Sequence, residues 1–145
     1  DFVLETEYEY LLLRWSERGS DVVFNASQAA DGMLRVMALV TLLLQPETSL
    51  PDVLILDEPE LGLHPYAITV LGGLIEALSK KIQIIVATQS PLLVDCFAPE
   101  AVVVVDRIER ASRFERLSEL RLREWLDEYS VSELWQKNVI GGRPV

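Results

Sequence analysis

The chain has 145 residues, half of them hydrophobic, and a formal net charge of −10. This length and apolar content suit a single globular domain, residues 1–145, with a sizeable core. The charge excludes the overall positive field that nucleic-acid binding usually needs, so contact with DNA would require a local basic face or residues outside this sequence. No segment has the apolar length of a membrane span, and one histidine with one cysteine gives no like pair of zinc ligands.

The first elements in chain order are two strands, predicted over residues 8–15 and 21–24. The polar, glycine-containing segment 17–20 between them indicates a β-hairpin. A long apolar helix is then predicted over residues 31–44, and two prolines separate it from the next strand.

A strand, a helix and a second strand follow, with the strands predicted at residues 53–56 and 82–87 and the helix beginning at Pro65. The apolar residues of this helix recur at helical spacing, so one face should pack on a sheet. They are Ala67, Leu71, Leu74 and Leu78. Such a unit favours parallel strands and a right-handed crossover, which places the carboxyl ends of both strands at the same edge of the sheet.

The C-terminal part begins with a short helix predicted over residues 91–97 and a buried strand over 101–105. The remainder is predicted to be helical, and Ser130 with Glu133 matches a capping box before the last helix. Arginines and glutamates alternate over residues 107–123, which favours a solvated, salt-bridged face over a track for phosphates.

Two adjacent carboxylates, Asp57 and Glu58, follow the apolar strand 53–56. Acidic residues are tolerated beside a buried strand only where it emerges into solvent or a site, and open parallel sheets bind ligands at this end. In nucleotide hydrolases a carboxylate here holds Mg²⁺, and a polar neighbour orients or deprotonates the attacking water. The pair has the order for this division of labour, although an ordinary acidic turn explains it equally well when it is taken alone.

Three segments strengthen the hydrolase interpretation when they are taken together. They are residues 30–35 (Ala-Asp-Gly-Met-Leu-Arg), 53–65 (an apolar strand, then Asp-Glu-Pro-Glu-Leu-Gly-Leu-His-Pro) and 84–91 (an apolar strand, then Thr-Gln-Ser-Pro). In this order and spacing they resemble the signature, Walker B and switch motifs of ABC-type ATPases of the RecF/SMC/OLD-like branch. The resemblance implies an α/β, P-loop NTPase-like fold, with a mostly parallel sheet flanked by helices, that binds and hydrolyses ATP with Mg²⁺.

The resemblance also implies roles for single residues. Asp57 would hold Mg²⁺, Glu58 would act on the attacking water, and Gln89 would sense the γ-phosphate. Many relatives carry histidine at the last position; glutamine can donate a hydrogen bond but carries no proton near neutral pH. His64 is expected in the segment that crosses the dimer interface in relatives, with a plain role at the start of a helix as the alternative.

The signature-like residues Ala30, Asp31 and Gly32 begin the helix predicted over residues 31–44. Helix N-termini bind anions, and in the family this one touches the γ-phosphate held by the opposite subunit, which implies a homodimer with nucleotide at its interface. Ala30 stands where a serine hydroxyl usually contacts phosphate, a loss of roughly 0.5 to 1.5 kcal/mol. An ordinary turn before a core helix is the alternative.

A phosphate-cradling loop is absent from the sequence, because none of the three lysines follows a glycine. The resemblance therefore predicts a C-terminal portion of an ATPase head, whose N-terminal part carries the P-loop in relatives. These residues alone are expected neither to bind ATP tightly nor to hydrolyse it. The single cysteine and the resemblance together predict a cytoplasmic location.

Two other functions stay open at this stage. One is a slow or non-hydrolysing module in which ATP drives dimerisation, as Ala30 and Gln89 suggest. The other is part of a metal-dependent nuclease system, because some relatives carry a TOPRIM domain; the strand ending at Asp106 lacks the Asp-x-Asp pair of that domain. DNA or protein partners would bind through regions outside this sequence, which does not specify the process that ATP drives.

Overall fold

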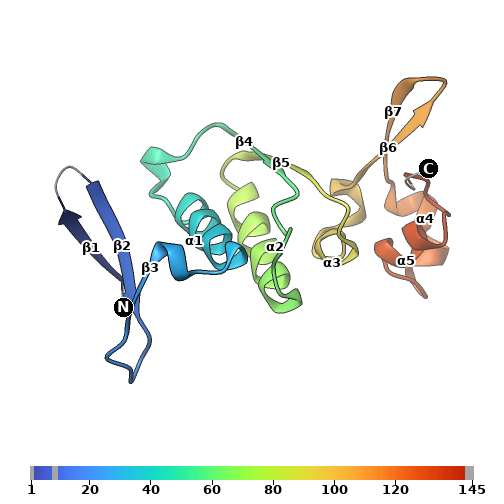
Figure 1. The fold of residues 1–145 in the computed structure, drawn as a ribbon. Coiled ribbons are helices and arrows are strands. Elements are labelled where there is room, and N and C mark those ends of the chain that lie inside the picture. Colours follow the sequence, from blue (N-terminus) through green and yellow to red (C-terminus); the bar gives the residue numbers. More distant parts are fainter. Residues whose placement is uncertain (1, 8–9, 143–145) are drawn as a thin grey trace. The chain divides into compact units, whose positions relative to one another are not determined.

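The computed structural model describes residues 2–7 and 10–142. They form two compact units, one ending at Gln45 and the other beginning at Pro46, and each is described by itself (Figure 1). Both units combine helices with small sheets, which confirms the predicted α/β class. No helix among the described residues is long and apolar enough to cross a bilayer.

The first unit contains a three-stranded antiparallel sheet and one long helix. Its elements are β1 (Phe2–Glu7), β2 (Tyr10–Ser16), β3 (Val23–Asn25), the 3-10 helix η1 (Ala26–Gln28) and α1 (Asp31–Leu43). The pairing of β2 with β3 confirms the predicted hairpin, and the Trp15 ring stacks on Phe24 with centroids 5.9 Å apart. Strand β1 was not predicted, and the first two residues of the predicted strand 8–15 lie outside the described residues.

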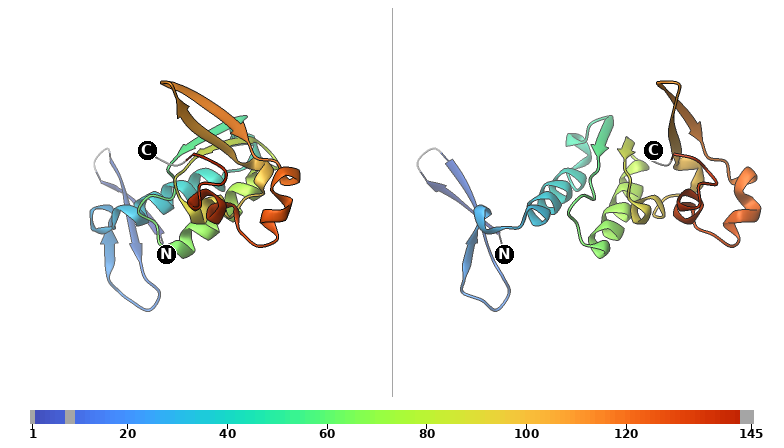
Figure 2. Two further views of the ribbon diagram at one scale, coloured as in Figure 1. Left: turned by 90° about the vertical axis from the view of Figure 1, so that its right-hand side faces the viewer. Right: turned by 45° about the vertical axis from the view of Figure 1, so that its right-hand side comes forward.

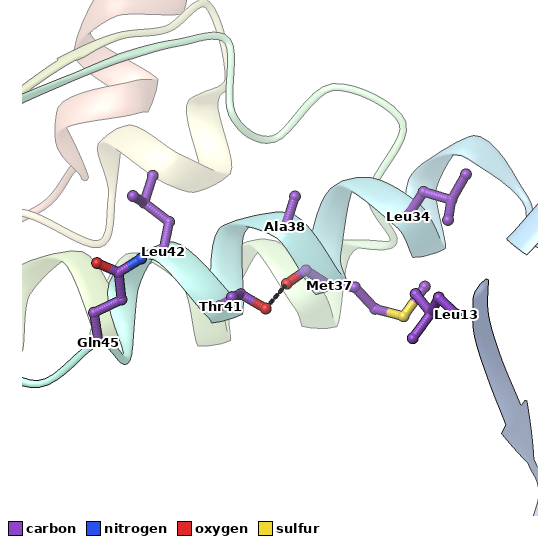
Figure 3. A pocket seen from close by; sticks show the side chains of 7 residues that line it. All are labelled: Leu13, Leu34, Met37, Ala38, Thr41, Leu42 and Gln45. Carbon is purple, nitrogen blue, oxygen red and sulfur yellow. Dashed lines mark hydrogen bonds between the residues drawn. The ribbon is translucent and has the colours of Figure 1, made fainter. Parts of the chain in front are cut away.

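Helix α1 confirms the helix predicted over residues 31–44 to within one residue. One side of it, together with a leucine of β2, lines a shallow apolar pocket (Figure 3). The lining residues are Leu13, Leu34, Met37, Ala38, Thr41, Leu42 and Gln45. The Thr41 hydroxyl donates to the Met37 carbonyl oxygen at 2.7 Å, so the polar group of this pocket residue is satisfied within its own helix.

The second unit begins with the 3-10 helix η2 (Glu47–Ser49) and then β4 (Val53–Asp57), α2 (Pro65–Ser79) and β5 (Gln83–Ala87). Strands β4 and β5 pair in parallel with Asp57 opposite Ala87, which confirms the predicted strand–helix–strand unit. Helix α2 lies along one face of the pair (Figure 1), where Leu56 is buried, while Ile55 on the opposite face is 69% exposed. Two-residue periodicity therefore separates a helix-covered face from an open one.

Helix α2 approaches α3 (Pro91–Val94) very closely at Gly72. A methyl group at position 72 would lie 2.5 Å from Cys96 Sγ, so only glycine fits without a shift of the neighbouring segment. Cys96 is half-buried, and burial raises the pKa of its thiol, with smaller contributions from the negative charges of Asp95 and Glu76. The predicted helix 91–97 is shorter in the structure, because α3 ends at Val94.

The remaining elements surround a second small core. They are the 3-10 helix η3 (Pro99–Ala101), β6 (Val103–Ile108), β7 (Ala111–Arg116), α4 (Glu119–Leu126) and α5 (Val131–Gln136). The core residues come from β6, the segment after β7 and both helices: Val104, Leu117, Leu122, Val131 and Leu134. Beyond this core, the β6–β7 hairpin extends away from α4 and α5 (Figure 2). The predicted capping box of Ser130 and Glu133 is confirmed at the start of α5.

The β6–β7 hairpin corrects the prediction that the chain is helical after residue 105. Its two-residue turn holds Glu109 and Arg110 at φ values of 50° and 69°, a conformation usually signalled by Asn or Gly. All six residues of β7 are exposed, so no apolar alternation marked it as a strand. The described sheets are therefore one parallel pair and two antiparallel groups. Antiparallel pairing is more common among the described strands than the predicted, mostly parallel sheet implied. Within the predicted charged face, Arg113 and Glu115 form an exposed ion pair at 3.5 Å.

Candidate functional site

The candidate site lies at the carboxyl ends of β4 and β5. Asp57 is the last residue of β4 and is exposed, and Glu58 directly after it is half-buried. The Glu58 amide donates to the Ala87 carbonyl oxygen at 2.8 Å, which continues the parallel ladder one step beyond the end of the strand. The carboxylates therefore sit on a backbone that is fixed by the sheet.

The backbone turns sharply at Glu58, whose φ is 42°. A left-handed conformation is uncommon for a residue with a Cβ, and such strain is concentrated at functional sites. The turn is closed by the Leu61 amide, which donates to the Glu58 carbonyl oxygen at 3.1 Å. Gly62, with φ of 78°, then allows the chain to reach His64 and the start of α2.

The two strand ends meet through their side chains. Gln89 Nε2 donates to Glu58 Oε1 at 3.2 Å, so the prediction that Asp57 and Gln89 share one edge of the sheet is confirmed. Gln89 is exposed beside a half-buried carboxylate. The pair can thus place an amide donor and a carboxylate acceptor around one small polar molecule such as water.

A second contact between the same loops joins Glu60 to Thr88. Thr88 Oγ1 donates to Glu60 Oε1, and the Ser90 amide in turn donates to Thr88 Oγ1 at 2.9 Å. Glu60 is only 8% exposed, so this link lies beneath the exposed Gln89–Glu58 contact. Sequence analysis assigned no role to Glu60 or Thr88; the signal available was a carboxylate between a proline and a leucine.

The carboxylates of the candidate site suit Mg²⁺, which needs few protein ligands, better than a metal ion that is held by protein side chains alone. No group of three or more His, Cys, Asp or Glu side chains that could hold a metal occurs among the described residues. Mg²⁺ usually keeps several waters and is held through one or two carboxylates plus substrate phosphates. The exposed Asp57 at the end of β4 is suited to be that carboxylate.

The other predicted site residues lie at helix starts. His64 Nδ1 accepts from the Tyr66 amide at 3.2 Å, so this side chain caps the start of α2. In the first unit, Ala30 precedes α1, with Asp31 and Gly32 in its first turn. No side chain caps this helix start. The structure thus groups Asp57, Glu58 and Gln89, and it describes the signature-like residues within a separate unit.

A helix-covered parallel pair with carboxylates at its strand ends is an α/β arrangement of the kind found in P-loop NTPase-like folds. A solved structure supports this class, with a TM-score of 0.67 over 88% of this chain and 79% of that chain at 19% identity; it comes from work on "ATP-driven dimerization and DNA stimulated activation of SMC ATPases". The family model described as "AAA domain, putative AbiEii toxin, Type IV TA system" matches residues 2–95, 94 of the 145 residues. The chain belongs to this family. No curated protein matches it.

Proposed function

We propose that these residues form the signature, Walker B and switch portions of an ABC-type ATPase head of the RecF/OLD-like branch, a single domain in which ATP hydrolysis is coupled to head-to-head dimerisation. The observation that carries the proposal is the hydrogen bond from Gln89 to Glu58, beside Asp57 at the end of the same strand. Family membership supports an ATPase, and the solved relative was studied for ATP-driven dimerisation.

In this proposal Asp57 supplies the carboxylate for Mg²⁺, which when bound would neutralise phosphate charge. Glu58, at its left-handed backbone position, orients the attacking water or accepts its proton. Gln89 donates to Glu58 Oε1 and would detect the γ-phosphate with the same amide group. Because glutamine does not titrate, the proton from water stays with Glu58.

The dimer contributes the remaining groups in the proposed mechanism. The first turn of α1, with Ala30, Asp31 and Gly32, would face the γ-phosphate bound by a second copy. His64, which is exposed at the start of α2, would lie in the segment that meets the partner. A P-loop-bearing segment joined to these residues would hold the remaining phosphates.

The test is steady-state hydrolysis of Mg²⁺-ATP by a protein that joins these residues to its P-loop-bearing lobe. Glu58→Gln should lower kcat by roughly 10²- to 10⁴-fold, because the base is lost, while ATP binding is kept. Glu76→Gln, at an exposed position of α2, is the matched control and should leave kcat unchanged. If the parent hydrolyses ATP and Glu58→Gln is equally active, the role proposed for Glu58 is wrong. If the parent does not bind ATP, the whole proposal is wrong.

A slow, ATP-gated dimerisation module is the second candidate. Two observations favour it: Ala30 provides no side-chain hydrogen bond at the start of α1, and position 89 carries an amide instead of an imidazole. The same preparation separates the candidates, because a module would bind ATP and dimerise without measurable turnover. The nuclease alternative is weaker, since Asp106 Oδ1 already accepts from the Gly142 amide at 2.7 Å and so holds the C-terminal segment.

A further inference from the structure

The most buried carboxylate of the candidate site is only half satisfied. Glu60 is 8% exposed, and its Oε1 accepts from Thr88 Oγ1. Its Oε2 is buried, and no donor among the described residues reaches it. A buried carboxylate with an unfilled acceptor opposes folding. Stability therefore does not explain a glutamate at this position.

Thr88 connects this carboxylate to the segment that carries Gln89. Its single hydroxyl proton goes to Glu60, and its oxygen accepts from the Ser90 amide at 2.9 Å. Thr88 and Ser90 flank Gln89, so both neighbours of that residue are held by one hydroxyl group. Gln89 itself reaches Glu58 through an exposed bond of 3.2 Å, which alone would be a weak restraint.

We propose that Glu60 is a positioning residue, which through Thr88 holds the Gln89 amide within hydrogen-bond distance of the Glu58 carboxylate. The inference rests on the proposed function, in which Glu58 and Gln89 surround the attacking water and the γ-phosphate. The loop after β4 and the end of β5 are thereby joined twice, once by the buried contact and once by the exposed one. The buried contact sets the geometry that the exposed contact uses.

The first test needs no nucleotide and uses the 145-residue chain. The side-chain amide resonances of Gln89 report its bond to Glu58 by NMR, and Glu58→Ala gives their position when that bond is absent. Glu60→Ala should move these resonances to the Glu58→Ala position, although Glu60 does not touch Gln89. Glu60→Gln keeps an oxygen that can accept from Thr88 and should restore most of the parent position. Glu76→Ala is the matched surface control and should cause no change.

The inference is wrong if Glu60→Ala leaves the Gln89 resonances at the parent position. If that variant does not fold, Thr88→Val and Thr88→Ser replace it, because they are similar in size and differ in the hydroxyl group. Both change a neighbour of Gln89, so only their difference is informative. In Thr88→Val the Gln89 resonances should lie at the Glu58→Ala position, and in Thr88→Ser they should lie at the parent position. Equal positions in the two variants would overturn the inference.

The second test separates positioning from a structural role. In the protein with its P-loop-bearing lobe, the apolar pair Glu60→Leu with Thr88→Val should lower kcat by roughly 10- to 100-fold and leave KM unchanged. In the 145-residue chain the same pair should unfold at a urea concentration close to that of the parent, because removal of a half-satisfied carboxylate offsets the loss of the acceptor for the Ser90 amide. Lower stability with unchanged kcat would show a structural role instead. If the parent protein has no activity, the proposed function fails, while the NMR result still decides whether Glu60 positions Gln89.

Discussion

The starts of α1 and α5 differ in how their first amide groups are satisfied. At α5, Ser130 Oγ accepts from the Glu133 amide at 3.3 Å and Glu133 Oε2 accepts from the Ser130 amide at 2.8 Å. At α1, Ala30 offers no side-chain oxygen, and only its carbonyl group enters the helix. The start of α5 is thus closed, meaning that side chains of its own sequence accept from its first amide groups. The start of α1 leaves first-turn amide donors for a group from outside the helix.

The closed start of α5 also contacts Asp95, which directly follows α3. Asp95 Oδ1 accepts from the Ser132 amide at 2.9 Å, and Oδ2 accepts from the hydroxyls of Ser132 at 2.6 Å and Ser130 at 3.1 Å. The start of α5 therefore attaches α3 to the C-terminal core. The closed start of α5 thus joins two elements, whereas no side chain caps the first turn of α1.

The largest effect on the free energy of unfolding is expected when the contacts between Asp95 and the start of α5 are removed. Asp95→Ala removes three acceptor contacts and leaves the buried Ser132 amide without a partner, which should lower the free energy of unfolding by about 2 to 4 kcal/mol. Urea unfolding measures the loss. Asp95→Asn keeps one acceptor oxygen and should lose less; equal stability of all three proteins would contradict the anchoring role.

A smaller loss is expected when the cap of α5 is removed together with its single contact to Asp95. Ser130→Ala should lower the free energy of unfolding by about 1 kcal/mol, because the Glu133 amide loses its acceptor. Ser118→Ala is the matched control, since Ser118 precedes α4 without a side-chain cap bond while Glu100 Oε1 accepts from the Glu119 amide. Comparable losses in both variants would show that serine at these positions acts through something other than capping.

The opposite sign is expected at α1. Ala30→Ser supplies a hydroxyl acceptor for the amide of Gly32 and should raise the free energy of unfolding by about 0.5 to 1 kcal/mol. If α1 binds phosphate in a dimer, the same variant should also lower the ATP concentration at which the P-loop-complete protein dimerises, as followed by light scattering. Greater stability without a change in dimerisation would mean that the α1 start binds no phosphate.

The smallest effect belongs to an exposed pair at another helix start. Lys81 Nζ lies 2.5 Å from Glu47 Oε1, and this hydrogen bond, with the positive charge, lowers the pKa of the Glu47 carboxyl group. The folded-state pKa is below the unfolded value, so the contribution to stability is complete above the unfolded pKa and is lost as the pH falls through the folded one. Lys81→Met should raise the NMR titration midpoint of Glu47 toward its ordinary value, and an unchanged midpoint would exclude the pair in solution.

The sequence predicted those parts of the fold that local patterns determine. Apolar runs and a helix of regular period predicted the β4–α2–β5 unit, and parallel pairing then placed Asp57 and Gln89 at one edge. Strand β7 was missed, because its turn uses Glu109 and Arg110 where Asn or Gly is usual.

The site was predicted unevenly for a related reason. Residues at the ends of apolar strands could be located from pairing alone, as Asp57 and Gln89 were. The contact between Glu60 and Thr88 joins side chains 28 positions apart across two loops, and neither period nor propensity specifies it. Contacts of this kind depend on loop conformation, including the left-handed backbone at Glu58, which a sequence pattern does not encode.

The close approach of α2 and α3 at Gly72 gives the chain an internal reporter. Cys96 is the only cysteine, and its thiol lies against Gly72 of α2, where there is no room for a side chain at position 72. Because burial raises the pKa of this thiol, little of it is thiolate near neutral pH while the helices are in contact. The rate at which a maleimide dye labels Cys96 therefore reports on the packing of the segment after α3 against α2. Helix α3 begins at Pro91, two residues after Gln89, so labelling with and without nucleotide would show whether a change at Gln89 reaches this contact.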